Sequence, residues 1–228
     1  MSLPGARLRA AGLRKRSPLL GAFLTMLLIR HGETALNAES RFRGHSEAGL
    51  NSRGRRQARA LARYLPRFSP ARVYSSPLKR CLETARPLAE RLGLTVVVEP
   101  RLIDLDYGAW QERPIAEVAA QSPGDYAAWM AGDLSLRFPG GELLEAVVER
   151  VRSFLDEMVE RHQGEVVAVV THNVLCQIAT CLLTGAPPQS FQSVRHDPGN
   201  FSVFRWRAGA VRADGLNLSP AAAHSGRA

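Results

Sequence analysis

The chain has 228 residues, of which 45% are hydrophobic and 22% are charged, so it can bury a sizeable core and has an ordinary composition for a globular protein. Its formal charge of +9 is uneven, because five basic and no acidic residues lie within residues 1–25, which leaves +4 for the rest. The basic segment has no interleaved aromatic residues, which argues against a nucleic-acid-binding protein. No apolar stretch approaches the length of a membrane span.

Both ends of the chain differ in composition from its middle. Residues 1–25 are expected to be a basic leader, either a targeting segment or the product of an upstream start codon. We prefer an unstructured or misassigned leader, with Met26 as the functional beginning, because the first strand is expected to start there. Residues 219–228, rich in Ala, Ser and Gly, predict a flexible tail, so one domain is expected over residues 26–218.

Strand and helix patterns alternate along the first half of this domain. The apolar residues 27–29 predict a buried parallel strand, and a polar loop over residues 32–51 follows it. Asn51 or Ser52 can cap a helix that runs to about residue 65. Residues 72–75 predict a second strand, and the following helix is expected between Pro77 and Gly93.

The second half continues the alternation after a short strand at residues 95–98 and a loop. Helical patterns near residues 115–120 and 125–130 predict a small helical cap region between about residues 101 and 137. The remaining predicted elements are a long helix to about residue 162, a strand at 165–170, a helix at 174–183 and strands at 201–206 and 210–212. This order predicts an α/β three-layer sandwich with a mostly parallel central sheet flanked by helices.

Two histidines directly follow strong strand predictions. Arg-His-Gly-Glu at residues 30–33 comes after the first strand, and Thr-His-Asn at residues 171–173 comes after the apolar strand at 165–170. Because open α/β sheets bind ligands at the carboxyl ends of their strands, the two imidazoles are expected to converge on one site. A histidine with an arginine beside it can attack or hold a phosphoryl group.

Two further segments complete a family pattern. Ser-Ser-Pro-Leu-Lys-Arg at residues 75–80 and Asp-Leu-Asp-Tyr-Gly-Ala-Trp at residues 104–110 lie between the two histidine motifs. Together the four segments resemble the histidine phosphatase superfamily, also called the phosphoglycerate mutase-like family, over about residues 26–206. The resemblance implies a phosphomonoester hydrolase that acts on a small phosphorylated metabolite through a phosphohistidine intermediate.

The resemblance assigns roles to individual residues. His31 is the expected nucleophile, while Arg30, Arg80 and His172 are expected to form the phosphate pocket. Arginine suits this task because its planar fork donates two hydrogen bonds to phosphoryl oxygens and its charge stabilises the transition state. Because these guanidinium groups take the place of a metal cation at the phosphate, neither a metal nor another cofactor is expected.

The proton donor to the leaving oxygen is expected to be Asp104, with Asp106 as the competitor. Asp104 is preferred because it lies three residues before the aromatic residue of Tyr-Gly-Ala-Trp, although many family members carry Glu at this position. Substrate contacts are expected from Asn37 through its amide, from Thr34 beside His31, from Gly44 and from the backbone of Asn173. Arg41 and Arg43 could reach a distal charge of the substrate, although loop arginines are more often solvated.

The same residues also serve two alternative functions. A phosphohistidine that transfers to a second hydroxyl would make the chain a cofactor-dependent phosphoglycerate mutase, and a chain without turnover would be a silent phosphate-ligand binding protein. The phosphatase is preferred because mutases are usually longer in the cap.

We expect a small phosphorylated substrate, no nucleic-acid or membrane partner and a cytoplasmic location, and we leave a homodimer open. Three cysteines without zinc spacing, of which Cys176 and Cys181 are expected to be buried thiols, agree with a reducing compartment.

Overall fold

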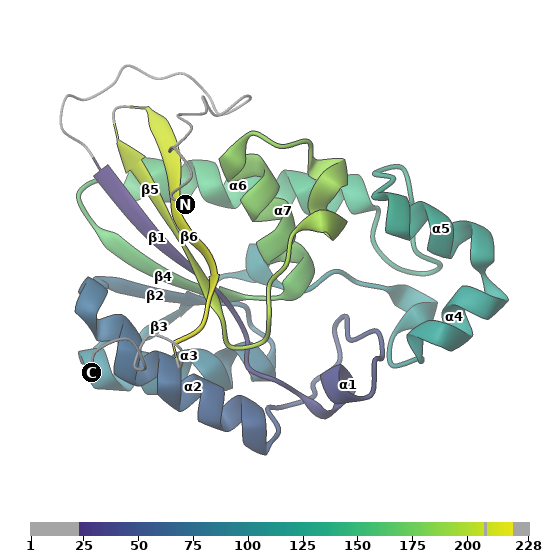
Figure 1. Cartoon of the computed structure of the whole chain (residues 1–228), viewed down its shortest axis with the longest axis horizontal. Coiled ribbons are helices and arrows are strands. Elements are labelled where there is room, and N and C mark those ends of the chain that lie inside the picture. The colour runs from purple at the N-terminus through teal and green to yellow at the C-terminus, as the bar shows by residue number, and fades with distance from the viewer. Residues whose placement is uncertain (1–22, 208, 221–228) are drawn as a thin grey trace, which may run out of the picture.

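The computed structural model describes residues 23–207 and 209–220, whose strands form one six-stranded sheet in the order β3-β2-β4-β1-β5-β6 (Figure 1). The strands are β1 (Phe23–Arg30), β2 (Arg72–Ser75), β3 (Val96–Val98), β4 (Val166–Thr171), β5 (Phe201–Arg207) and β6 (Ala210–Leu218). The pairs β1–β4, β2–β4 and β2–β3 are parallel, whereas β1–β5 and β5–β6 are antiparallel. The mostly parallel sheet is confirmed.

Helices cover both faces of this sheet, as Figure 1 shows. On one face α2 (Ser52–Tyr64) and α3 (Lys79–Leu92) pack against Leu27 and Ile29 of β1. On the other face α6 (Leu144–Arg161) and α7 (Asn173–Thr184) pack against Met26 and Leu28. The alternation of these four residues between the faces follows from the two-residue period of a strand, so each face has its own core.

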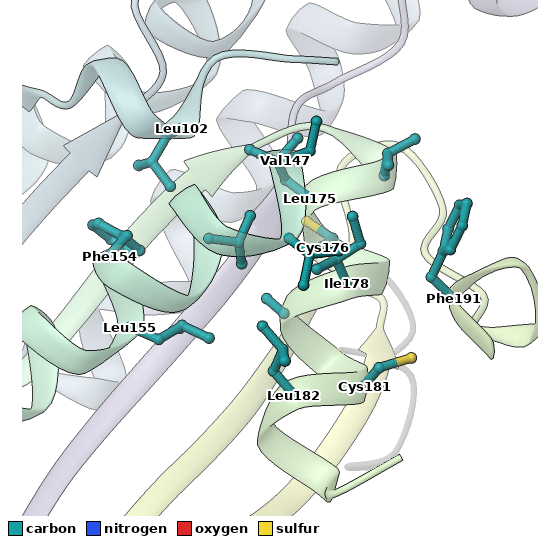
Figure 2. Close-up of a cluster of buried hydrophobic side chains, with 14 of the residues drawn as sticks. Leu102, Val147, Phe154, Leu155, Leu175, Cys176, Ile178, Cys181, Leu182 and Phe191 are labelled. Atoms are coloured by element: carbon teal, nitrogen blue, oxygen red, sulfur yellow. The ribbon is translucent and has the colours of Figure 1, made fainter. Parts of the chain in front are cut away.

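The larger core lies beneath α6 and α7. Figure 2 shows Phe154 and Leu155 of α6 in the same cluster as Leu175, Ile178 and Leu182 of α7. All five side chains are buried, which at about 2 kcal/mol for each makes this interface a major stabilising contribution. The three cysteines, Cys81, Cys176 and Cys181, are free and buried, as expected for the last two.

The cap region lies beside the sheet and carries α4 (Ile115–Gln121) and α5 (Pro123–Ala131) (Figure 1). Its interior is aromatic, since Tyr107 and Trp129 both meet the ring of Phe138 edge-on, at centroid distances of 5.2 and 5.5 Å. The short helices are α1 (Ala35–Ala38), η1 (Leu65–Phe68), η2 (Pro100–Leu102), η3 (Gly108–Trp110) and η4 (Pro188–Ser193).

Three boundaries differ from the predicted ones. β1 begins at Phe23 rather than near Met26, because Leu24 is buried and the Thr25 amide donates to the Glu165 carbonyl at 3.0 Å. The predicted start of the first strand near Met26 is therefore three residues too late. β6 extends to Leu218, and the polar loop at 32–51 contains α1. Residues 1–22 and 221–228, which hold most of the proposed leader and tail, lie outside the described residues.

The helices within the described ranges are all too short or too polar to cross a bilayer.

Candidate active site

The sheet register brings His31 and His172 together. β1 and β4 are parallel neighbours in which Arg30 pairs with Thr171, so the next residue on each strand is a histidine. The His31 amide continues this ladder by donating to the Thr171 carbonyl at 3.0 Å. The two rings lie edge to face with their centroids 5.3 Å apart. The expected convergence of the two imidazoles is therefore present at the carboxyl ends of the strands.

His31 presents one free ring nitrogen to this site. Its Nδ1 lies 2.7 Å from the carbonyl oxygen of Gly32, which can only accept, so Nδ1 carries the proton and Nε2 has the lone pair. Nε2 is buried and has no hydrogen-bond partner within the described residues. Burial lowers the pKa of His31 well below its usual range, and the positive charges of Arg80, Arg30 and Arg43 lower it further. The ring is thus neutral at physiological pH, as a nitrogen nucleophile has to be.

Arg80 is the hub of the pocket and is fully buried. It lies in the first turn of α3, and two loop carbonyls hold it: Nη2 donates to Gly44 at 2.6 Å and Nη1 to Ser46 at 2.7 Å. Nη2 also donates to Asp104 Oδ2 at 2.9 Å. These bonds fix the plane of the guanidinium group before any ligand binds, which is what electrostatic stabilisation of a phosphoryl group requires.

His172 has the opposite tautomer. Arg80 can only donate, so its Nε–H bond to His172 Nδ1 at 3.2 Å places the proton of the neutral ring on Nε2. Nε2 lies 2.7 Å from Ser76 Oγ, which accepts that proton. Burial and the charge of Arg80 lower the pKa of His172 well below its usual range. His172 therefore stands beside His31 as a second neutral imidazole.

Arg30 precedes His31 in the chain, and a side chain and a backbone carbonyl hold its guanidinium group. Its Nη1 donates to Asn173 Oδ1 at 2.9 Å and to the carbonyl oxygen of His196. Burial, and then repulsion from Arg43, lowers the pKa of Arg30 to about 10. The Asn173 side chain thus orients Arg30, whereas a contact of its backbone with substrate stays a prediction.

The structure separates the two aspartates. Asp104 is 3% exposed, and its Oδ2 lies 2.9 Å from Arg80 and 3.4 Å from His172 Nδ1. Asp106 instead accepts from the Gly108 amide at 2.8 Å and shapes the turn of η3. Asp104 is therefore the aspartate that lies at Arg80 and His172, and Asp106 belongs to the cap.

The remaining predicted contacts fall into two groups. Gly44 has a φ of +49°, and a side chain there would overlap that of Gln111, so a glycine is needed where the loop approaches Arg80. Thr34 and Asn37 bond to each other in the capping box of α1, with Thr34 Oγ1 2.9 Å from Asn37 Oδ1. The side-chain hydrogen bonds described for Thr34 stay within this box, so its expected role in orienting His31 stays a prediction.

Two groups at the site were not assigned a role from the sequence, whereas Arg41 and Arg43 were expected to reach a distal charge of the substrate. Ser76 fixes the tautomer of His172, and its place in the Ser-x-Leu-x-Arg segment was the available signal. The carbonyl oxygen of His196 holds Arg30 from a loop 166 residues away, for which the sequence carries no signal. Arg43 has a buried Nε, whereas Arg41 is bound at the surface to Glu39.

Comparisons with known proteins agree with this geometry. Residues 26–219 match the family model described as histidine phosphatase superfamily (branch 1). The chain is 37% identical over 178 residues to phosphoserine phosphatase 1 of Hydrogenobacter thermophilus, covering 78% of this chain and 84% of that protein. It is 31% identical over 172 residues to a probable phosphoglycerate mutase, GpmB, of Yersinia enterocolitica, covering 75% of this chain and 80% of that protein.

A solved structure is similar as well. A putative α-ribazole-5′-P phosphatase from Escherichia coli superimposes with a TM-score of 0.78 at 28% identity, covering 86% of this chain and 96% of that chain. Another group of curated relatives is longer, and the chain spans 40% of their length at 41% identity over 148 residues. The family match spans the whole pocket, from His31 to His172, and the chain belongs to the histidine phosphatase superfamily.

Proposed function

We propose that the chain hydrolyses a small phosphomonoester in two displacements, with His31 Nε2 as the nucleophile. The observation that carries this proposal is the buried, unpartnered Nε2 of a neutral His31, which faces His172 in a pocket of guanidinium groups. Family membership and the phosphatase names among its relatives make the chain a phosphomonoesterase.

In the first displacement a bond forms between His31 Nε2 and phosphorus as the bond to the ester oxygen breaks. The leaving oxygen keeps the electron pair of the broken bond and takes a proton from Asp104, whose carboxyl group lies 3.4 Å from His172 Nδ1. Arg30 and Arg80 bind the equatorial oxygens, where the negative charge of the transition state is spread. A phosphoryl oxygen would displace Asp104 from Arg80 Nη2. The released carboxyl group would then lie beside the leaving oxygen.

In the second displacement a water molecule attacks the phosphohistidine. Asp104, now a carboxylate, accepts a proton from the water while the bond between Nε2 and phosphorus breaks, and inorganic phosphate leaves. His31 returns to its starting tautomer because its Nδ1–H stays bound to the Gly32 carbonyl throughout. This cycle needs no metal and no other cofactor.

A phosphoglycerate mutase is the second candidate, favoured by the relative with that name. In a mutase the phosphohistidine would transfer to a second hydroxyl of a retained substrate instead of to water. The relatives' names carry phosphoserine, phosphoglycerate and α-ribazole phosphate, so they do not choose one substrate. We further propose a cytoplasmic enzyme without nucleic-acid or membrane partners; homodimer formation stays a prediction.

Trapping of the intermediate tests this proposal. Mixed with p-nitrophenyl phosphate labelled in the phosphoryl group and quenched in alkali, the wild type should carry label on the peptide containing His31. The His31→Ala variant should carry no label, and its kcat should fall about a thousandfold or more. Near-wild-type turnover of a folded His31→Ala variant would refute the proposed nucleophile. Isomerisation of 3-phosphoglycerate faster than phosphate release would make the chain a mutase.

A further inference from the structure

A chain of hydrogen bonds leads from the ring of His31 to helix α2. His31 Nδ1 donates to the Gly32 carbonyl oxygen at 2.7 Å. The amide on the other side of that peptide group, which belongs to Glu33, donates to Gln57 Oε1 at 2.8 Å. Gln57 lies in α2, and its Nε2 donates to the Pro198 carbonyl oxygen at 2.8 Å. One peptide group and one side-chain amide therefore connect the ring to two distant parts of the chain.

The two ends of the Gln57 amide group cannot be exchanged. The Glu33 N–H can only donate, so it requires Oε1, and the Pro198 carbonyl can only accept, so it requires Nε2. Gln57 is also packed closely, because a Cβ built on Gly199 would lie 2.6 Å from the Cβ of Gln57. The partners on both sides thus fix the orientation of this half-buried side chain.

The segment that accepts from Gln57 also holds the backbone at the nucleophile. The Gly199 amide donates to the His31 carbonyl at 3.1 Å, and the Arg30 amide donates to the Asn200 carbonyl at 3.1 Å. Gln57 therefore bonds at one end to the peptide group that follows His31, and at the other end to the segment that holds the main chain of His31. This places it where it can set the ring relative to its own backbone.

The Gly32 carbonyl has its largest effect while the ring is being phosphorylated. In the first displacement the lone pair of His31 Nε2 forms the bond to phosphorus as the bond to the ester oxygen breaks. Positive charge then develops on the ring, and the Nδ1–H bond stays intact. A carbonyl oxygen that accepts from Nδ1 stabilises this charge, and a hydrogen bond to the amide of the same peptide group polarises that carbonyl further.

We propose that Gln57 is a positioning residue for the nucleophile. It holds the Gly32–Glu33 peptide group so that its carbonyl keeps the His31 proton on Nδ1 and leaves Nε2 free to attack. The inference rests on the proposed function, and it adds a residue outside the segments that carry the family resemblance. The competing interpretation is that Gln57 only joins α2 to the segment at Pro198, in which case it would affect stability but not the tautomer of His31.

Gln57→Met tests the proposal, because methionine has an unbranched chain of similar length but no amide group. With 15N-labelled histidine, and with the His31 signals assigned by their loss in His31→Ala, the wild type should show His31 protonated on Nδ1 alone. In Gln57→Met both tautomers should be populated, because the peptide group can then rotate. The rate of phosphohistidine formation from p-nitrophenyl phosphate should fall about 10-fold, the equivalent of one hydrogen bond.

Inhibition by inorganic phosphate shows whether the anion pocket is intact. Its inhibition constant in Gln57→Met should stay within about twofold of the wild type, since Arg80 and Arg30 are held by other partners. Arg59→Met is the matched control, because it places the same side chain at an exposed position of α2 and should change neither the tautomer nor the rate.

Gln57→Glu separates the two bonds of the side chain. Its carboxylate keeps an acceptor for the Glu33 amide but has no donor for the Pro198 carbonyl. It should therefore keep the wild-type tautomer and a rate within about threefold of the wild type. Thermal unfolding midpoints check that all variants fold, and Gln57→Asn, which is one carbon too short to make both bonds, replaces Gln57→Met with the same expectations if that variant does not fold.

A folded Gln57→Met variant with the wild-type tautomer, or with the wild-type rate of phosphohistidine formation, would overturn the inference and leave the proposed function standing. So would a Gln57→Glu variant that loses as much as Gln57→Met, because the bond to Pro198 would then be the important one. A wild type that forms no phosphohistidine at His31 would overturn the proposed function, and the inference with it.

Discussion

At the residue scale, the two imidazoles of the site are both neutral but have opposite tautomers. A backbone carbonyl takes the Nδ1 proton of His31 and frees Nε2, whereas Arg80 occupies Nδ1 of His172 and leaves its proton on Nε2 for Ser76. The two histidines are thus distinguished by their hydrogen-bond partners, since burial lowers both pKa values. His31 has the free nitrogen that the proposed attack needs, and the ring nitrogen Nδ1 of His172 accepts from Arg80.

Asp104 provides a prediction at this scale. In Asp104→Asn no proton can be given to the leaving oxygen, so kcat on an alkyl phosphate should fall by about 100-fold or more. The loss should be much smaller for p-nitrophenyl phosphate, whose leaving group is stable without protonation. Steady-state rates over a series of leaving groups measure the difference.

Asp106→Asn is the control for this experiment, because Asn can still accept the bond from the Gly108 amide. Its rates should stay near those of the wild type for every leaving group. A leaving-group dependence in Asp106→Asn, and none in Asp104→Asn, would reverse the assignment of the acid.

At the element scale, the start of α2 packs directly on the loop that carries the nucleophile. A Cβ built on Gly32 would lie 2.6 Å from the Gly54 carbonyl oxygen, and one on Gly54 would overlap the backbone of Glu33. Asn51 caps α2 and donates to Glu33 Oε1 at 2.9 Å, so the helix and the loop are also bound together. Two glycines therefore allow the backbone contact that sets the position of His31.

Gly54→Ala is the prediction that belongs to this contact. In most helices this change stabilises by up to about 1 kcal/mol, but here overpacking should lower the free energy of unfolding by roughly 2 kcal/mol. The displaced loop should also lower kcat/KM. Urea unfolding and steady-state kinetics measure the two effects.

Gly124→Ala in α5 is the matched control, because nothing lies within 4 Å of the position of its Cβ. It should be neutral or slightly stabilising, with unchanged kinetics. Equal and small effects at both glycines would show that the Gly32–Gly54 contact does not constrain the active-site loop.

At the scale of the whole molecule, stability should depend on the histidines buried at the site. Burial lowers the pKa of His196 to about 4, with the charge of Arg30 as a further cause. Because an unfolded histidine has a pKa of about 6.5, the unfolded chain binds a proton between pH 6.5 and 4 that the native chain does not. The free energy of unfolding therefore falls as pH falls through this window.

His196 alone should lower the free energy of unfolding by about 3 kcal/mol between pH 6.5 and pH 4. This corresponds to roughly 1.4 kcal/mol per pH unit within the window. In His196→Gln the dependence of the free energy of unfolding on pH should be shallower by that amount. Urea unfolding at several pH values from 7.5 to 4.5 measures both slopes, and parallel slopes would contradict a buried neutral His196.

Much of this molecule could be predicted from the sequence, because apolar runs mark the buried strands and candidate catalytic residues directly follow two of them. The α/β class and the convergence of His31 and His172 follow from local patterns together with the rule on strand ends, whereas the place of Arg80 followed from the family resemblance. Tertiary register and loop packing could not be predicted. The buried Nε of Arg43 and the bond from Arg30 to His196 depend on tertiary packing, and no local pattern marks them.

The boundary error at the start of β1 has a different cause. The acid-free composition of residues 1–25 suggested a separate leader, although Phe23 and Leu24 continue the apolar run. Antiparallel pairing of Phe23 with Arg207 and of Leu24 with Trp206 on β5 extends the strand, and that pairing is visible only in the folded sheet. Composition marked the leader, but pairing decides where the strand begins.

The neighbouring positions of β1 and β4 have a consequence for how the enzyme loses function under stress. The distance between neighbouring strands sets the spacing of the two imidazoles, and backbone hydrogen bonds on both sides of β1 hold that distance. The proposed acid Asp104 lies instead on the loop between η2 and η3, and loops open at lower free-energy cost than a central strand. Mild heating should therefore slow the hydrolysis of poor leaving groups before it slows that of p-nitrophenyl phosphate.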